Sequence, residues 1–300
     1  FLRGYTCPSV IVKHVQYPNQ PQHARGRNTL ISHQRKLISY EVESRWYQDF
    51  AHLCSAKCRV PEFIAVEQDE HSMLLIIEDL QNLHLTKTLR SVPPTPSGNY
   101  ISKAQIQAGI AWLAHFHAEH LGQSAKGLWP TGGYWHLQTR PDELEAMIDC
   151  ELKSAAQSLD QQLQDCRYTT LIHGDAKAAN FCFDVTGHHV AAVDFQYVGS
   201  GCGIKDIVIF LCSSVPYQEC QQRVPSLLND YFAILKSALK EKTNASEIAE
   251  LEQEWRQLYT VAWADYLRFM QGWNPDNWKI NTYSESMMQQ GLAQLSVSLS

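Results

Sequence analysis

Patterns typical of strands and helices are distributed unevenly along this chain, and that distribution restricts the fold more than any other feature. Up to about Leu80 the sequence favours the order strand, helix, strand, strand, and beyond it long helical patterns dominate. The exception is the stretch from Leu171 to Asp194, where short apolar runs of strand type flank a polar cluster. The order predicts an α+β protein with a small β-rich lobe, residues 1–80, and a larger, mainly helical lobe, residues 81–300.

The elements of the first lobe follow from short patterns. The β-branched run SVIVKHV at 9–15 predicts a strand, and residues 34–53 carry apolar side chains about four apart, which predicts an amphipathic helix. The segment 60–80, VPEFIAVEQDEHSMLLIIEDL, predicts two strands around a polar turn at 68–71. A stretch rich in Pro, Ser and Gly at 91–100 predicts a loop before the second lobe, whose helices we expect at 101–122, 142–164, 224–240 and 246–272.

Composition narrows the classes of partner. The 300 residues are 44% hydrophobic, which is ample for a core, and 25 basic against 31 acidic residues give a net charge of −6. With no Lys/Arg-rich run, the sequence does not favour a nucleic-acid partner or an anionic membrane surface. The longest apolar stretches are far below the roughly 18 to 20 residues that span a bilayer. A small-molecule ligand is the better expectation.

Cysteines and histidines do not form a recognisable metal framework. The nine cysteines are an odd number, and several lie inside apolar runs, so we expect reduced thiols in a cytoplasmic protein. His52, Cys54 and Cys58 lie close together, but a second pair at zinc spacing is missing from the sequence. The histidines of HFHAEH at 115–120 fall mostly on different helix faces. The sequence also lacks an initiating Met and a leader pattern, so we interpret it as a piece of a longer reading frame.

The polar cluster itself lies in LIHGDAKAANFCFD, residues 171–184, and in VAAVDFQY, residues 190–197. Asp175 and Asn180 fall between two strand-like runs, and Asp194 ends a third, so the three could gather at one end of a short hairpin. Phosphoryl transfer needs such a set, because a carboxylate orients and deprotonates the attacking hydroxyl while an Asn and a second Asp bind Mg²⁺ through oxygen.

The motifs HGDAKAAN and VDFQY resemble the catalytic loop and metal-binding segment of protein-kinase-like small-molecule kinases, a superfamily of aminoglycoside phosphotransferases, choline and ethanolamine kinases and ecdysteroid kinase-like proteins. The resemblance extends over nearly the whole chain and implies a two-lobed kinase-like fold that uses ATP and Mg²⁺. It implies that Asp175 is the catalytic base, that Asn180 and Asp194 bind the metal, and that His173 braces the loop. Lys177 occupies a position where many kinases carry a lysine that contacts phosphate.

The flanking segments fit the same resemblance. SVIVKHV is similar to the kinase strand whose lysine, here Lys13, binds the α- and β-phosphates of ATP. Its ion-pair partner on the following helix is Glu41 or Glu43, and the pattern favours Glu43. LLIIEDL is similar to the strand that enters the interlobe hinge, where the backbone near Glu78, Asp79 and Leu80 would meet adenine, and Asp206 lies where the family keeps a buried aspartate that ties the catalytic loop to a helix.

The sequence departs from the kinase pattern in three places. A glycine-rich phosphate loop is not found in the twelve residues before Lys13, so either the sequence is truncated here or the loop is degenerate. Gln196 stands where protein kinases have Gly after Asp-Phe, although Asp-Phe-Gln is familiar among ecdysteroid kinase-like proteins. An activation-type segment ending in Ala-Pro-Glu does not follow Asp194, which favours a small-molecule acceptor over a protein substrate.

The acceptor is a hydroxyl of a small molecule, such as a choline-, aminoglycoside- or steroid-like alcohol, and the resemblance does not choose among these. Aromatic residues at helical spacing in 259–278 are typical of a core, but late helices build the acceptor pocket in such kinases, so Trp263, Asp265, Trp273 or Trp278 could line it and suit a cationic alcohol. Two alternatives stay open. One is a catalytically silent nucleotide-binding or scaffold protein with a kinase fold, and the other is a hydrolase that uses HGD as a metal site.

Overall fold

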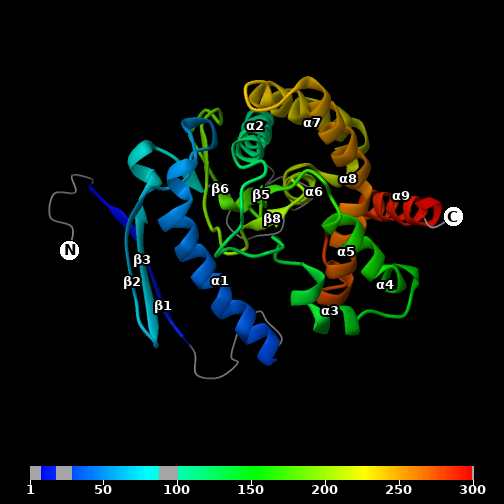
Figure 1. Ribbon diagram of the computed structural model, residues 1–300, viewed down its shortest axis with the longest axis horizontal. Coiled ribbons are helices and arrows are strands. Elements are labelled where there is room, and N and C mark those ends of the chain that lie inside the picture. Colours follow the sequence, from blue (N-terminus) through cyan, green and yellow to red (C-terminus); the bar gives the residue numbers. More distant parts are fainter. Residues whose placement is uncertain (1–7, 18–28, 88–100, 299–300) are drawn as a thin grey trace.

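The computed structural model describes residues 8–17, 29–87 and 101–298, and it has two groups of elements side by side (Figure 1). A three-stranded sheet and a long helix form the group at the N-terminal end, and the remaining helices form the other. The α+β architecture with a small β-rich lobe and a larger helical lobe is therefore confirmed. The predicted loop at 91–100 and the segment preceding Pro8 lie outside the described residues. Within the described part of the chain, no helix is long and apolar enough to cross a membrane.

The first sheet is antiparallel and consists of β1 (Val10–Gln16), β2 (Phe63–Gln68) and β3 (Ser72–Glu78), in the order β1-β3-β2. Its tight turn between β2 and β3 forms because the Asp69 carboxylate accepts the backbone N–H groups of His71 and Ser72, both at 2.7 Å. In the β1–β3 register Lys13 lies opposite Leu75, so the lysine is fixed over the middle of the buried central strand.

Helix α1 (Leu30–Asp49) begins and ends four residues earlier than the predicted helix at 34–53. It begins early because the Thr29 hydroxyl accepts the N–H of Ser32 and caps the first turn, a signal that apolar spacing does not reveal. The N-terminal end of α1 also contacts the second lobe, where Arg35 Nη1 donates to the carbonyl of Thr139 at 2.6 Å. One helix thus spans from the sheet to the helical lobe (Figure 1).

The helical lobe has α2 (Lys103–Glu119), α6 (Ile204–Ser214), α7 (Tyr217–Leu239), α8 (Ala245–Trp273) and α9 (Thr282–Ser298). This part of the chain also has short strands: β4 (Thr86–Lys87) before α2, and β5 (Thr170–Ile172), β6 (Phe181–Phe183), β7 (Val190–Ala192) and β8 (Gly199–Gly201) between α2 and α6. β4, β6 and β7 form one small sheet and β5 pairs with β8. Single turns of 3₁₀ helix occur at 51–53, 56–58, 80–83, 137–139 and 178–180. Helix α7 begins well before the predicted 224 and continues through Pro225.

The single helix predicted at 142–164 is wrong. The segment forms three helices instead, α3 (Pro141–Glu145), α4 (Glu151–Ser154) and α5 (Ala156–Gln164). Lys153 stabilises the first break, because its ammonium group donates to the carbonyls of Met147 at 2.8 Å and Glu145 at 3.3 Å. These carbonyl groups at and after the end of α3 therefore have a hydrogen-bond donor without a further turn of helix.

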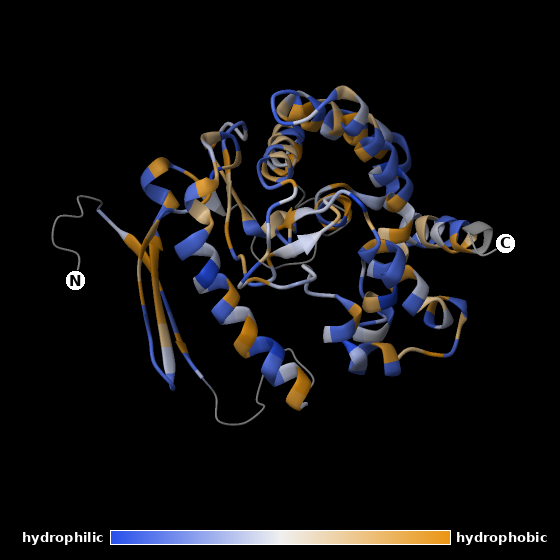
Figure 2. Ribbon diagram, in the orientation of Figure 1, coloured by the Kyte–Doolittle hydropathy of each residue, from blue (hydrophilic) through white to orange (hydrophobic). Residues whose placement is uncertain are grey.

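Helix α6 lies at the centre of the helical lobe and is almost entirely buried, with α2 and α8 packed against it. The outer helices, in contrast, show hydrophilic and hydrophobic residues alternating along their length (Figure 2), as expected for helices with one face to solvent.

An aromatic cluster joins the two lobes. The Trp46 indole of α1 is fully buried and stacks on Phe195, with ring centroids 4.5 Å apart, and Phe195 also packs against Phe116 of α2 and the His173 ring. Because Phe195 directly follows Asp194, this packing fixes the end of the β6–β7 hairpin relative to α1.

We expect Trp46→Ala to lower the free energy of unfolding by about 3 to 5 kcal/mol, because it leaves a cavity between α1 and Phe195. Urea denaturation followed by circular dichroism would measure this. Trp273→Ala is the matched control, since Trp273 is 42% exposed, and it should cost about 1 kcal/mol or less. Equal losses in the two variants would contradict the assignment of Trp46 as the contact that joins the lobes.

Candidate active site

The segment from His173 to Asn180 forms a sharp loop between β5 and β6, and a buried carboxylate shapes it. Asp206 of α6 is fully buried and accepts the backbone N–H of His173 at 2.6 Å and that of Gly174 at 2.9 Å. Gly174 has a φ of +77°, and a Cβ there would lie 2.1 Å from the carbonyl oxygen of Tyr197, so only glycine fits. As predicted, Asp206 ties the loop to a helix.

The His173 ring contacts the backbone of both segments that form the site. Its imidazole is fully buried, and burial lowers its pKa, which favours the neutral ring despite the carboxylates nearby. Nε2 donates to the carbonyl of Val193 at 3.1 Å, and Nδ1 accepts the N–H of Asp175 at 3.3 Å. The ring therefore braces the loop, as predicted, by linking the backbone of Asp175 to the residue that precedes Asp194.

The Asp175 carboxylate is surrounded by polar groups of its own loop. Lys177 Nζ lies 2.6 Å from Asp175 Oδ2, and Asn180 Nδ2 donates to the same oxygen at 3.1 Å and to the Asp175 carbonyl at 2.8 Å. Burial alone would lower the pKa of Lys177, but attraction and hydrogen bonding from Asp175 raise it above its ordinary value. Lys177 is therefore positively charged, and it both neutralises and positions the Asp175 carboxylate.

Asp194 joins this group across the hairpin of β6 and β7. The N–H of Val193 donates to the carbonyl of Asn180 at 2.9 Å, so Asn180 and Asp194 lie at the same open end of the hairpin. Asp194 has a φ of +75°, an uncommon conformation that sets the direction of its carboxylate. The predicted gathering of Asp175, Asn180 and Asp194 is therefore present.

The residues that could hold a metal are an amide and a carboxylate. Because Asn180 Nδ2 donates to Asp175, its oxygen is turned away from that carboxylate, and the Asp194 side chain is 36% exposed. Such hard oxygen donors suit Mg²⁺, which usually completes its shell with water and substrate phosphates. Groups of three or more His, Cys, Asp or Glu side chains that could hold a metal unaided do not occur within residues 8–17, 29–87 and 101–298.

Lys13 reaches the same end of the site from β1 and pairs with Glu43 of α1. Its ammonium lies 3.9 Å from Asp194 Oδ1. Burial would lower the pKa of Lys13, but Glu43 and Asp194 raise it, whereas burial raises the pKa of Glu43 against the opposing effect of Lys13. Glu41 is exposed, so of the two candidates the structure selects Glu43.

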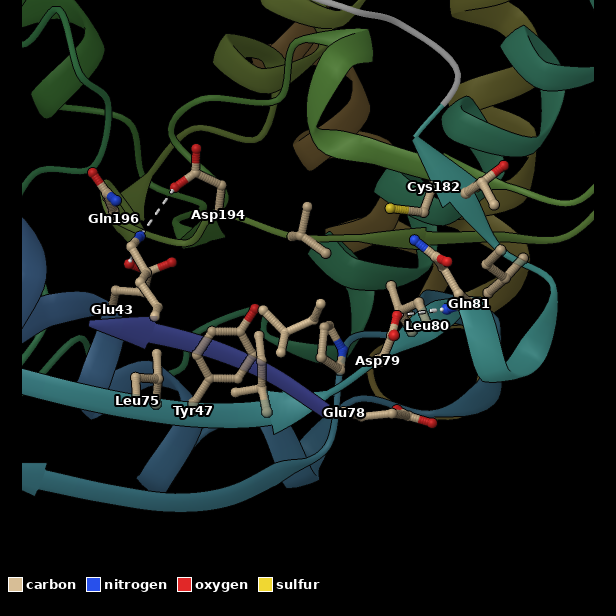
Figure 3. Close-up of a pocket in the computed structure, with 17 residues that line it drawn as sticks. Glu43, Tyr47, Leu75, Glu78, Asp79, Leu80, Gln81, Cys182, Asp194 and Gln196 are labelled. Atoms are coloured by element: carbon tan, nitrogen blue, oxygen red, sulfur yellow. Dashed lines mark hydrogen bonds and ion pairs between the residues drawn. The ribbon is translucent and has the colours of Figure 1, made fainter. Parts of the chain in front are cut away.

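A cavity of about 480 Å³ opens beside these residues (Figure 3). Lys13, Glu43, Asp194 and Gln196 line one end of it. The rest of the lining is mainly apolar and includes Ile11, Leu75, Ile77, Leu80, Leu85, Cys182 and Val193; Leu75 lies beside Glu43, whereas Leu80 and Cys182 lie at the opposite end (Figure 3). An apolar slot that continues into a charged end has the character required by a flat aromatic base attached to phosphates.

The predicted hinge residues lie at the apolar end. Glu78, Asp79 and Leu80 all line the cavity. The Glu78 side chain forms an ion pair with Arg59 at 2.6 Å, and the Asp79 side chain caps the next turn through the N–H of Gln81 at 3.0 Å. These two carboxylates are thus engaged by the protein itself.

The sequence did not reveal a second lysine beside this end of the cavity. Lys36 Nζ of α1 donates to Gln196 Oε1 at 2.9 Å, and Gln196 lines the same cavity as Glu43 and opposes the rise in the pKa of the Glu43 carboxyl. The sequence did contain a pattern that indicates this lysine, because Lys36 lies seven residues before Glu43 and therefore on the same helix face.

The suggested acceptor residue Asp265 is a core residue. Its carboxylate is buried, with Arg268 Nη2 at 2.7 Å from Oδ1 and Trp135 Nε1 at 3.0 Å from Oδ2. Trp263 is also buried, whereas Trp273 is exposed and stacks on Phe269. The carboxylate expected to attract a cationic alcohol is therefore already neutralised inside the protein.

Residues 129–243, which contain the whole catalytic loop and the Asp-Phe-Gln segment, match the model of the Ecdysteroid kinase-like family. The resemblance to this superfamily of small-molecule kinases is confirmed. The ecdysteroid kinase-like segment begins shortly before the loop that packs on Gly174 and ends after α7. None of the curated proteins matches the chain.

Solved structures similar to this chain include kinases of small alcohols and amines. A microcompartment-associated aminopropanol kinase is 13% identical, with 96% of this chain and 83% of that chain covered and a TM-score of 0.47. A putative aminoglycoside phosphotransferase from Ralstonia eutropha is 13% identical, with 84% and 80% covered and a TM-score of 0.46. An ethanolamine kinase from Plasmodium vivax is 11% identical, with 89% and 72% covered and a TM-score of 0.39.

We expect Asp206→Asn to lower the free energy of unfolding by about 3 kcal/mol. An amide would turn its NH₂ group toward one of the two backbone N–H donors, leaving that donor buried and unpaired. Urea denaturation measures the loss, and Asp165→Asn, which changes an exposed carboxylate, is the control and should stay within about 0.5 kcal/mol of the unmodified protein. Unchanged stability of Asp206→Asn would show that the loop holds its shape without this carboxylate.

Proposed function

We propose that this protein is an ATP-dependent phosphotransferase that moves the γ-phosphoryl group of ATP to a hydroxyl of a small molecule. The observation that carries the proposal is that Asp175, Asn180 and Asp194 gather at one hairpin end, where Asp194 lines a cavity together with the Lys13–Glu43 pair. These residues come from two lobes and from segments far apart in the sequence. A polar hairpin that only caps its own turns would not need the lysine of β1.

Each residue has a role that its surroundings support. Asp175 orients the acceptor hydroxyl and takes its proton, while Lys177 compensates the carboxylate and adds positive charge next to the transferred group. Lys13, held by Glu43, binds the inner phosphates of the nucleotide. His173 is a positioning residue, because it contacts only the backbone of the two functional segments.

Asn180 and Asp194 would hold Mg²⁺ together with the phosphates. When bound, the ion offsets negative charge on the phosphoryl oxygens. Asp194 faces the ammonium of Lys13 at 3.9 Å, so in the protein alone this carboxylate is partly balanced by the lysine.

The acceptor is proposed to be a small alcohol of the choline-, aminoglycoside- or steroid-like kinds. A short connection supports a small acceptor over a protein one, because only residues 195–203 separate Asp194 from α6, and β8 within them pairs with β5. A cytoplasmic location remains a proposal that rests on the cysteine pattern of the sequence.

We expect Asp175→Asn to reduce the turnover number by about a hundredfold to ten-thousandfold, because the proton acceptor is lost. The assay is Mg²⁺-dependent ADP release across a panel of choline, ethanolamine, aminoglycosides, sugars and sterols. ATP binding should persist in the variant. Asp165→Asn is the control and should keep full activity.

The same assay separates the alternatives. Tight binding of Mg·ATP without turnover on any member of an extended panel, and without any difference between Asp175→Asn and the unmodified protein, would favour a silent nucleotide-binding protein. Phosphate release from substrates without ATP would favour a hydrolase. Absence of ATP binding would refute the kinase proposal.

Glu43→Gln should lower kcat/KM for ATP by about tenfold or more, because Lys13 would lose the charged hydrogen bond that positions it. Glu41→Gln, two positions away on the exposed side of the same helix, is the matched control and should change it less than about twofold. Steady-state kinetics with ATP as the varied substrate would measure both. If the two variants behave alike, Lys13 does not depend on Glu43.

A further inference from the structure

We infer that Lys36 of α1 is a second cation for the outer, β- and γ-phosphates of the nucleotide, and that Gln196 positions it. The inference rests on the proposed function of the same site. Lys36, Tyr40 and Glu43 lie at positions i, i+4 and i+7 of α1 and thus on one face. Glu43 lines the charged end of the cavity, so this face of the helix borders it.

The Lys36 ammonium is not ion-paired with any carboxylate of the described residues. The helix positions three and four residues away are Ser32, His33, Ser39 and Tyr40. Among the residues that the structure describes, Lys36 forms no ion pair within 4 Å, its recorded partners being the Gln196 oxygen at 2.9 Å and the Tyr40 ring at 4.6 Å. A half-buried lysine without a counterion is uncommon, since buried charges are normally paired.

Lys36 is influenced by another lysine, Lys13, and by Asp194, the carboxylate proposed to bind Mg²⁺. Burial and the neighbouring Lys13 both lower the pKa of Lys36, and Asp194 and Glu43 only partly oppose them. Lys13 lies 3.9 Å from the carboxylate proposed to bind Mg²⁺, and the charge of that carboxylate also acts on Lys36. A polyphosphate at this end would neutralise both lysines and relieve their repulsion.

Gln196 explains how Lys36 is held there. The Gln196 oxygen accepts from Lys36, and Gln196 lies close enough to Glu43, the partner of Lys13, to oppose the rise in the pKa of that carboxyl. The glutamine thus lies between the two lysines and next to the glutamate. Only one of the three N–H donors of the Lys36 ammonium is used by Gln196. A glycine at position 196, as in protein kinases, could not form this link.

The test is a comparison of nucleotide affinities by calorimetric titration of the full chain in the presence of Mg²⁺. Lys36→Met should weaken ATP and ADP binding by about tenfold, the usual cost of losing one charged contact to phosphate, and change AMP binding less than about twofold. Lys36→Arg should retain most of the affinity. Gln196→Met should reproduce part of the loss, and the double variant should lose little more than Lys36→Met alone.

Arg45→Met is the matched control, because Arg45 is an exposed cation of the same helix that pairs with Asp49. It should leave all three affinities unchanged. Equal weakening of ATP and AMP in Lys36→Met would mean a structural role and overturn the inference, as would an unchanged ATP affinity. If Lys13→Met loses ATP and Lys36→Met does not, this inference fails and the proposed function stands, whereas absence of ATP binding by the unmodified chain refutes both.

Discussion

The buried carboxylate of Asp206 is the constraint on which the candidate site depends. Two consecutive backbone N–H groups, of His173 and Gly174, point at it, so the loop must turn sharply at this position. His117 of α2 donates to the same carboxylate at 3.2 Å, which joins the loop to two central helices at once. Because a buried acceptor is costly when its donors are absent, the loop geometry and the helix packing stabilise each other. The catalytic loop is therefore part of the core and not a surface appendage.

Helix α1 connects the helical lobe to the sheet. Its N-terminal end is fixed by Thr29 donating to Asp142 at 2.6 Å and by Arg35 donating to Thr139, while its middle contacts the cavity and its later turns stack Trp46 on Phe195. A rotation of this helix would move Glu43 and the Trp46 contact together. The position of Lys13 is consequently set by contacts that originate in both lobes.

Short-range signals allowed most of the site to be predicted, and long-range packing accounts for the rest. The loop residues Asp175 and Asn180 are close in sequence, and the roles expected of them follow from the resemblance of their motif to small-molecule kinases. The sequence analysis noted Gln196 only as a departure from Gly and did not single out Lys36, because their contact joins positions 160 residues apart. Asp265 was misjudged for a related reason, since its neutralising partners, Arg268 on the next helical turn and the distant Trp135, decide that it is core and not pocket. The helix at 141–164 is broken because Lys153 donates hydrogen bonds to carbonyl groups of an earlier turn. The spacing of apolar residues does not reveal such a contact.

The connection that follows Asp194 and Phe195 bears on how the proposed site would be regulated. In protein kinases a long segment after the Asp-Phe motif orders on phosphorylation and positions the helix that carries the glutamate. Here the connection from Phe195 to α6 is short and hydrogen-bonded through β8, and α1 is already tied to the second lobe at its first turns. The Lys13–Glu43 pair forms without any such segment. In the proposed phosphotransferase the ion pair is therefore set by the packing of α1 on the second lobe and not by a segment that must first become ordered.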